Sequence, residues 1–133
     1  MEAAVDQRLR PRERLTKSAD YAKVLRRGVR VDGRLFNLAA APNQRTHDRL
    51  GLTVSRRVGG AVQRNRAKRI LRDAYRRRRR RSGLACDLVL VAKRELLDCT
   101  RAELDRELDR IFQRLESRQG RQPPAGPRPD RAG

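Results

Sequence analysis

The sequence predicts an α/β fold in which helices cover a single β-sheet. Three observations lead to this prediction: an amphipathic segment near residue 20, several segments of strand length after it, and a long amphipathic segment between the last two strands. The predicted order is helix, two or three strands, helix, strand, helix. The chain of 133 residues shows no internal repeat and is long enough for one modest domain but not for two.

The first helix is expected to begin at Ser18, a good N-cap, with Asp20 in its first turn, where the helix dipole favours an acid. We expect Gly28 to end this helix in the left-handed conformation. The apolar residues of the helix recur at helical spacing and are Tyr21, Val24 and Leu25.

Four short segments are predicted to be strands. Residues 29–31 form a short strand before a tight turn, and residues 35–41 follow that turn. In residues 50–55 the alternation of apolar and polar side chains indicates a strand with one buried face. The continuous apolar run at residues 87–92 is typical of a strand buried on both faces.

The second helix is predicted over residues 61–81, with Ser82 and Gly83 ending it. A helical wheel separates an apolar side from a side that is almost wholly cationic. The apolar side consists of Ala67, Ile70, Leu71, Ala74 and Tyr75. The polar side consists of Asn65, Lys68, Arg69, Arg72 and Arg76.

A capping box from Thr100 to Glu103 predicts the start of the last helix. Its apolar face is predicted to be Leu104, Leu108, Ile111, Phe112 and Leu115. The folded domain is expected to span residues 14–118. Residues 1–13 are predicted to be a flexible basic segment, and residues 119–133 a disordered tail rich in Pro, Gly and Arg.

The charge balance indicates the kind of partner. The chain has 35 Lys and Arg against 16 Asp and Glu, a net charge of +19. Such a chain attracts polyanions, so nucleic acid or an anionic membrane is the first expectation. Nearly all the basic residues are Arg, whose planar fork binds phosphate and stacks on bases, which favours nucleic acid. Codon bias in the source organism is an equally good explanation of the arginine excess.

Several classes of protein are excluded. No apolar run of eighteen residues is present, so we expect no membrane span, and the first 14 residues lack the apolar core of a signal peptide. Cys86 and Cys99 are too few and too far apart for a disulfide framework or a zinc ribbon, and Cys86 is interpreted as a buried structural thiol. We therefore expect a cytoplasmic protein.

No catalytic site is predicted. His47 is the single histidine and has no Cys, Ser or acid neighbour that would form a nucleophilic pair. Asp73 is the only acid in residues 56–81, too few carboxylates for a metal-dependent nuclease, so we predict no metal site either. The amides at Gly59 and Gly60 have room for one phosphate, but the Lys and Ser or Thr of a nucleotide-hydrolysing loop are missing.

The basic segment at residues 56–81 holds thirteen basic residues and one acid. These cations are predicted to lack local partners and to repel each other at helical spacing, so the segment indicates an external polyanion. The six consecutive arginines Arg76 to Arg81 are interpreted as adding nonselective attraction. Asn65 is expected to orient Arg64 and Arg66 or to contact a ribose or base, unless it is a plain surface residue.

Residues 54–75 resemble the signature of the bacterial ribonuclease P protein family, including the sequence Arg64, Asn65, Arg66. The resemblance extends over residues 14–118. It implies a two-layer α/β sandwich with about four strands and three helices. It also implies a left-handed strand–helix–strand crossover through the basic helix, against the usual right-handed rule.

The resemblance further implies a division of labour. A large catalytic RNA removes the 5′ leader from precursor tRNA, using Mg²⁺ held mainly by that RNA. One protein molecule per RNA, with no role at a membrane, would bind the RNA and the single-stranded leader, broaden the substrate range and lower the magnesium requirement. The leader would lie in a cleft between the first helix and the sheet. The subtype of the RNA and the leader preference stay open.

The residues that match the family's basic positions, and would face the RNA, are Arg56, Arg57, Arg64, Asn65, Arg66, Lys68, Arg69 and Arg72. The residues expected to line the leader cleft are Tyr21, Leu25, Arg26, Arg34 and Phe36. Leu25 and Ala39 stand where the family often has aromatics, so base stacking is expected to be weak. Tyr21 and Phe36 equally fit core positions. A ribosome-associated RNA-binding protein is the alternative function, and a DNA-binding factor a weaker third.

Overall fold

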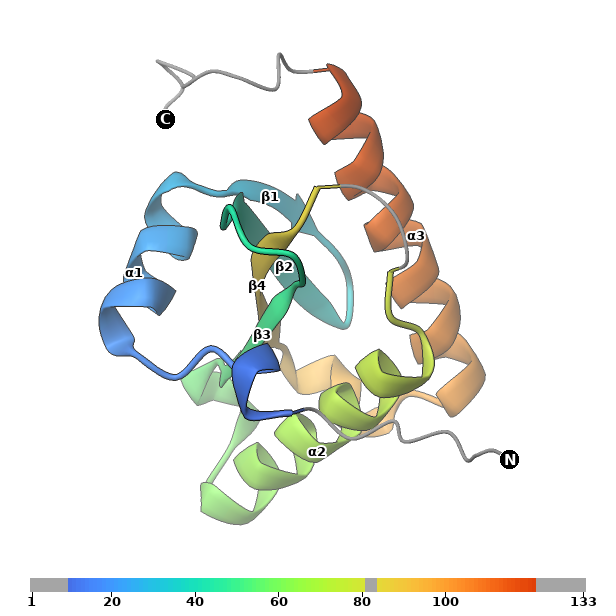
Figure 1. The fold of residues 1–133 in the computed structure, drawn as a ribbon. Helices are drawn as coiled ribbons and strands as arrows, with labels where there is room; N and C mark the ends of the chain where they lie inside the picture. The colour runs from blue at the N-terminus through green and yellow to red at the C-terminus, as the bar shows by residue number, and fades with distance from the viewer. Residues whose placement is uncertain (1–9, 81–83, 122–133) are drawn as a thin grey trace.

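The computed structural model describes residues 10–80 and 84–121, which fold around one four-stranded sheet with the order β1-β2-β4-β3 (Figure 1). The strands are β1 (Val29–Asp32), β2 (Phe36–Pro42), β3 (Arg49–Val54) and β4 (Cys86–Ala92). The helices are α1 (Ser18–Arg27), α2 (Ala61–Arg77) and α3 (Arg101–Arg121), with short 3₁₀ turns at η1 (Pro11–Glu13), η2 (Arg56–Val58) and η3 (Arg94–Asp98). Predictions for residues 1–9, 81–83 and 122–133 lie outside the described residues.

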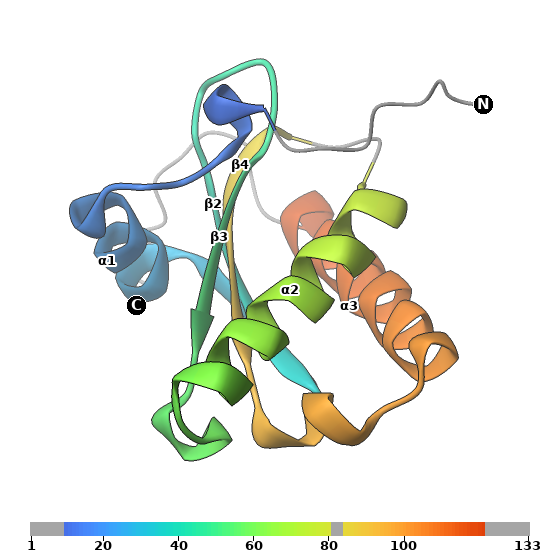
Figure 2. The same cartoon turned by 90° about the horizontal axis from the view of Figure 1, so that it is seen from below.

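The sheet is mixed. β2 pairs antiparallel with β1 and with β4, whereas β3 and β4 are parallel neighbours joined through α2. In Figure 2 both β3 and β4 run downward, β3 lies in front of β4, and α2 passes on their right. That path is a left-handed crossover, so the exception to the usual rule that the resemblance implies is confirmed.

Helices cover both faces of the sheet (Figure 2). Strand alternation sends Leu38, Leu88 and Leu90 toward α2 and α3, where the larger hydrophobic core lies. The alternate residues Ala39 and Val89 face α1 and form a smaller cluster with its Val24. The predicted four strands and three helices are confirmed, and because α1 lies on the opposite face from the other helices, it adds a layer to the two that were predicted.

The last helix follows its sequence signals closely. The Thr100 side chain accepts the Glu103 amide at 3.1 Å, and the Glu103 carboxylate accepts the Thr100 amide at 2.9 Å, which completes the capping box. The five predicted apolar residues of this helix are all buried. α3 continues to Arg121, so residues 119–121 are helical and not part of a disordered tail. One reason is tertiary, because the Gln119 side chain reaches the Cys86 thiol at 3.0 Å.

The first helix differs from prediction at both ends. Ser18 is its first helical residue, and Lys17 is the N-cap without a side-chain cap bond. Gly28 is extended, with φ −74°, so the predicted left-handed conformation is wrong. Close packing explains the glycine instead, because a Cβ there would lie 2.6 Å from the Val24 carbonyl oxygen and 2.7 Å from that of Ala40.

Two further boundaries were predicted incorrectly. α2 ends at Arg77, four residues before the predicted end, because Arg78 leaves the helical conformation with ψ 38°. The folded part of the chain begins before residue 14, because η1 is formed and the Leu15 amide donates to the Leu50 carbonyl at 2.8 Å. This contact places the N-terminal segment along β3, an edge strand, where an unpaired backbone would otherwise be open.

Candidate RNA-binding surface

α2 presents the predicted RNA-binding residues on its outer side. Its buried residues are Ala67, Leu71, Ala74 and Tyr75, which pack against β3, β4 and α3. Asn65, Arg66 and Arg69 are exposed, and Arg64, Lys68 and Arg72 are partly exposed. The helical wheel therefore gave the correct face: the apolar side fixes the helix to the sheet, and the cationic side is left to solvent.

The cations of this outer side have no partner among the residues that the structure describes. Across residues 10–80 and 84–121, no ion pair and no side-chain hydrogen bond is made by Arg56, Arg57, Arg64, Arg66, Lys68, Arg69 or Arg72. Pairs such as Lys68 and Arg72 repel each other at i,i+4 spacing. An external polyanion would remove that repulsion. We call these seven cations the open basic face.

η2 brings Arg56 and Arg57 to the start of α2, where both are exposed. The Ser55 hydroxyl accepts the Arg57 amide at 3.2 Å and holds this turn. Gly59 has φ +138°, a conformation that side chains rarely adopt, so a glycine is required where the chain turns into the helix. Gly60 provides no side-chain cap for the first amides of α2, and phosphate binding at Gly59 and Gly60 stays a prediction.

The arginine run at the end of α2 is different, because its described members are paired with acids of the protein. Each described arginine of the run has a carboxylate partner: Arg76 with Asp73, Arg77 with Asp105, Arg78 with Asp109, Arg79 with Glu13 and Arg80 with Asp48. Most of these acids come from distant parts of the chain. Sequence spacing along one helix does not reveal them, so the prediction that the whole run lacks partners failed here.

Tyr21 is fixed on the other face of the sheet. Its ring lies directly over Gly51, where a Cβ would come within 2.6 Å of the ring. The Leu52 amide donates to its hydroxyl at 3.2 Å, and the residue is partly buried. Leu25 and Arg26 lie further along α1, with Leu25 36% exposed. These three residues are on the helix that borders the predicted leader cleft.

Phe36 and Arg34, the other two residues predicted to line the leader cleft, do not lie with the residues of α1. Phe36 is 0% exposed and belongs to the core on the α2 and α3 side, so it is unavailable to stack on a base. Arg34 is exposed in the β1–β2 turn, near the start of α3. There the Thr100 amide, and to a smaller extent the Arg34 guanidinium, holds the pKa of Glu103 below its ordinary value.

Sequence reasoning missed a row of residues on the α1 side of the sheet. Asn37, Val91 and Thr53 are paired neighbours across β2, β4 and β3, and all three are partly exposed. Their strands place them on the same face as Ala39 and Val89, beside α1. The signal in the sequence was the polar Asn37 between the apolar Phe36 and Leu38, which marks the outward side of the strand.

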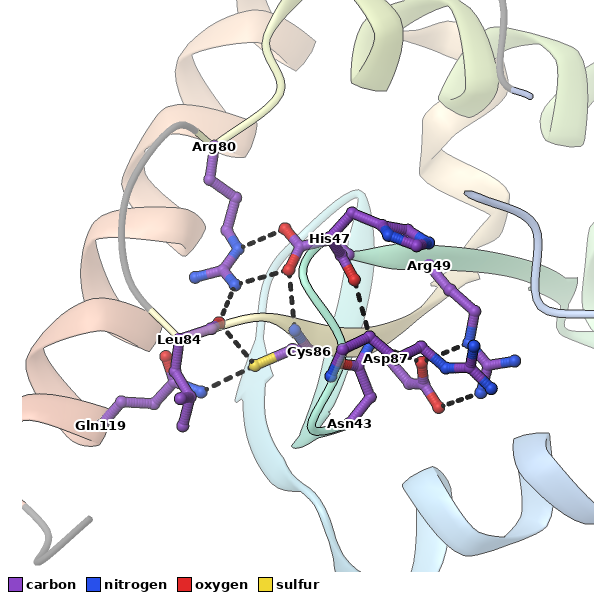
Figure 3. A network of polar contacts seen from close by, with 10 residues as sticks. Asn43, His47, Arg49, Arg80, Leu84, Cys86, Asp87 and Gln119 are labelled. Atoms are coloured by element: carbon purple, nitrogen blue, oxygen red, sulfur yellow. Dashed lines mark hydrogen bonds and ion pairs between the residues drawn. The ribbon is translucent and has the colours of Figure 1, made fainter. Parts of the chain in front are cut away.

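An ion pair closes one end of this face (Figure 3). Arg49 binds Asp87 through two hydrogen bonds of 2.8 and 2.7 Å, and the Asn43 amide donates to Asp87 at 3.0 Å. Burial opposes ionisation, yet these hydrogen bonds prevail and lower the pKa of Asp87. Because both charges are satisfied, Arg49 adds little to the positive potential of the molecule.

Comparison with known proteins decides the family. A family model described as Ribonuclease P matches residues 9–116. The chain belongs to the ribonuclease P protein family. The ribonuclease P protein component of Desulforapulum autotrophicum is 39% identical over 103 residues, which cover 77% of this chain and 88% of that relative. The corresponding component of Dehalococcoides mccartyi (strain ATCC BAA-2266 / KCTC 15142 / 195) is 38% identical over 99 residues, covering 74% and 81%.

Solved structures of ribonuclease P proteins agree with the fold. The Staphylococcus aureus protein superposes with a TM-score of 0.66 at 29% identity, covering 76% of this chain and 93% of that chain. The Thermotoga maritima protein gives a TM-score of 0.68 at 24% identity, covering 77% and 96%, which shows the same fold. The α/β architecture of this ribonuclease P family member is therefore that of its solved relatives.

No helix in the part of the chain that the structure describes has the length and apolar character needed to cross a membrane. Within residues 10–80 and 84–121, no three His, Cys, Asp or Glu side chains come together in a way suited to a metal ion. Cys86 is buried as predicted, and burial raises the pKa of its thiol, as expected for a structural residue.

Proposed function

We propose that this chain is the protein component of a ribonuclease P and that its open basic face binds the catalytic RNA. The observation that supports the proposal is that the basic residues fall into a paired group and an unpaired group. Those at the end of α2 are paired with acids, whereas seven cations on the first part of α2 and on η2 have no partner among the described residues. An RNA backbone supplies the anions that these cations do not find within residues 10–80 and 84–121.

Each side chain of the face has a chemical role in this proposal. The guanidinium groups bind phosphate oxygens through paired hydrogen bonds, and Lys68 acts as a point charge. Asn65 lies between Arg64 and Arg66, and its amide both donates and accepts, which suits a ribose hydroxyl or a base edge. Phosphate binding releases counterions, so affinity falls steeply as salt rises.

The single-stranded 5′ leader of precursor tRNA is proposed to lie along α1 and the exposed row of the sheet. Leu25 and Arg26 border this surface, and Asn37, Thr53 and Val91 form its floor. None of these five residues is aromatic, and Tyr21 is already held by the Leu52 amide. Leader binding would then depend on charge, amide hydrogen bonds and shape more than on stacking.

The chemistry is proposed to reside in the RNA. The protein would supply no catalytic residue, and Mg²⁺ would be held mainly by the RNA. The cations of the open basic face would neutralise phosphates that otherwise require additional Mg²⁺, which lowers the magnesium requirement of the complex. One protein molecule per RNA, acting in the cytoplasm, completes the proposal.

Reconstitution tests this function. Precursor tRNA is incubated with the purified protein, with ribonuclease P RNA transcribed in vitro from the same genome, and with both, over a series of Mg²⁺ concentrations. We expect no cleavage by the protein alone, cleavage by the RNA only at high Mg²⁺, and accurate 5′ cleavage by the complex at low Mg²⁺. Cleavage by nuclease-free protein without RNA would contradict the proposal. Co-purification with ribosomal particles in place of this RNA would favour the ribosome-associated alternative.

A further inference from the structure

The end of α2 is tied to three separate parts of the chain. Arg77 and Arg78 reach α3, Arg79 reaches η1, and Arg80 reaches the loop between β2 and β3. We call these arginines and their carboxylates the arginine clasp. Its members are Arg77 with Asp105, Arg78 with Asp109, Arg79 with Glu13, and Arg80 with Asp48.

Arg80 is the innermost member of the clasp (Figure 3). Its side chain is 2% exposed and binds both oxygens of Asp48, each at 2.9 Å. Asp48 also accepts the backbone amide of Cys86 at 2.7 Å, and Arg80 donates to the Leu84 carbonyl oxygen. The pair thus fixes the β2–β3 loop over the first residue of β4, with its hydrogen-bonding groups satisfied inside the protein.

Arg79 joins the N-terminal segment to the same region. Its guanidinium lies 5.9 Å from the centre of the Tyr75 ring and binds Glu13 at 3.0 Å. Glu13 in turn accepts the Arg10 amide at 2.8 Å. The Tyr75 ring and the Phe112 ring from α3 pack in a T-shaped arrangement, with 6.3 Å between ring centres. Arg79 therefore lies beside an aromatic contact between α2 and α3.

Arg77 and Arg78 connect the two long helices directly. Arg77 binds Asp105 at 2.9 Å, and both side chains are largely covered, at 24% and 22% exposed. Arg78 binds Asp109, one helical turn further along α3, with 2.8 Å between Nε and Oδ1. An RNA phosphate would compete with a carboxylate for either guanidinium, and the Arg78 pair is the more exposed of the two.

We infer that the RNA-binding face of α2 ends at Arg72 and that the arginine clasp is a positioning device. The clasp fixes α2 at one end so that its other end presents the open basic face at a set angle to the sheet. Arg76, paired with Asp73 on the same helix, separates the two regions. The inference rests on the proposed RNA-binding function. It divides one continuous basic sequence into residues that bind RNA and residues that hold the fold.

Matched double variants of the full chain test the inference. One double variant carries Arg77→Gln and Arg78→Gln, and the other carries Arg64→Gln and Arg66→Gln. Each removes two charges. Affinity for the in vitro transcribed ribonuclease P RNA is measured over a series of salt concentrations, and thermal unfolding is recorded for each free protein. We expect the Arg64/Arg66 pair to flatten the salt slope by about 0.7 to 0.9 per lost phosphate contact. The Arg77/Arg78 pair should keep the slope and lower the unfolding midpoint.

A flattening by the Arg77/Arg78 variant equal to that of the Arg64/Arg66 variant would overturn the inference. If the Arg64/Arg66 variant leaves the slope unchanged, the proposed RNA-binding face fails instead, and the two failures are distinguishable.

A charge exchange between Arg77 and Asp105 provides an independent test. Arg77→Asp should lower the unfolding midpoint, and adding Asp105→Arg should restore part of the loss. Equal midpoints for the single variant and the exchange would show that the pair does not hold the helices together.

Discussion

Single residues decide how the charges of this protein are used, and Asp87 is an informative example. It is largely buried at the start of β4, yet two hydrogen bonds from Arg49 and one from Asn43 keep it ionised. Because its folded-state pKa lies below the ordinary value of 3.8, ionisation of Asp87 stabilises the fold above that value. The stabilisation is lost as pH falls through the folded-state pKa.

Asp87→Asn should lower the free energy of unfolding at neutral pH by about 2 kcal/mol, because a charge-assisted bond is weakened and Arg49 loses its partner. The difference between variant and wild type should shrink as pH falls below about 4, because the carboxyl of the unfolded chain is protonated first and that of the native protein at lower pH. Urea denaturation at pH 7 and pH 3 measures both values. Asp32→Asn, at an exposed position in β1, is the control and should have little effect. An equal difference at the two pH values would show that ionisation is not the cause.

At the scale of elements, the stretch from η2 through α2 to Arg80 divides into two regions. The residues up to Arg72 include cations that repel each other, and Arg77 to Arg80 bind acids of other segments. Removing a charge from the first region should therefore relieve repulsion, whereas removing one from the second should break a contact. The difference in stability between two otherwise similar substitutions follows from their positions on the helix.

Arg80→Gln should lower the free energy of unfolding by about 3–5 kcal/mol, because Asp48 would be left largely buried without its charged partner. Arg72→Gln should be neutral or stabilise by about 0.2–0.5 kcal/mol, because it removes a repulsion with Lys68 at i,i+4. Urea unfolding of the two variants at one pH and salt concentration makes the comparison. Similar losses in both variants would contradict the division into a region that repels and a region that is paired.

At the scale of the whole molecule, the net charge of +19 is a source of self-repulsion that the folded chain tolerates. Salt screens exposed charges over about 10 Å at 0.1 M, but it screens half-buried pairs much less. The open basic face is exposed, whereas three pairs of the arginine clasp are partly covered. Salt should therefore act mainly on the repulsion.

The unfolding midpoint of the free protein should rise as salt increases from about 0.01 M to about 0.15 M, the range in which screening develops. The midpoint of the double variant with Arg64→Gln and Arg66→Gln should rise less with salt, since part of the repulsion is already removed. Thermal unfolding at several NaCl concentrations gives both trends, with a sulfate series to separate screening from anion binding. A midpoint that falls with salt in the wild-type protein would mean that ion pairs dominate over repulsion.

Much of the fold could be predicted from local patterns. The capping box at Thr100, the apolar stripe of α3 and the wheel of α2 each depend on neighbours in the sequence, and each was confirmed. The site was predicted less completely. Phe36 was predicted to line the leader cleft because it matches an aromatic position of the family, but strand alternation turns it to the opposite face, and Asn37 lies on the α1 side instead.

The sequence by itself determined that this protein is basic, that its second helix has an apolar and a cationic side, and that it belongs with the ribonuclease P proteins. These properties are local, because composition, periodicity and motif depend on residues close together in the chain. Only the tertiary structure decided which cations are available to RNA. The carboxylates of Glu13, Asp48, Asp105 and Asp109 reach the arginines of the clasp across separations of 28 to 66 residues. A charge is neutralised by its neighbours in space, and folding determines those neighbours.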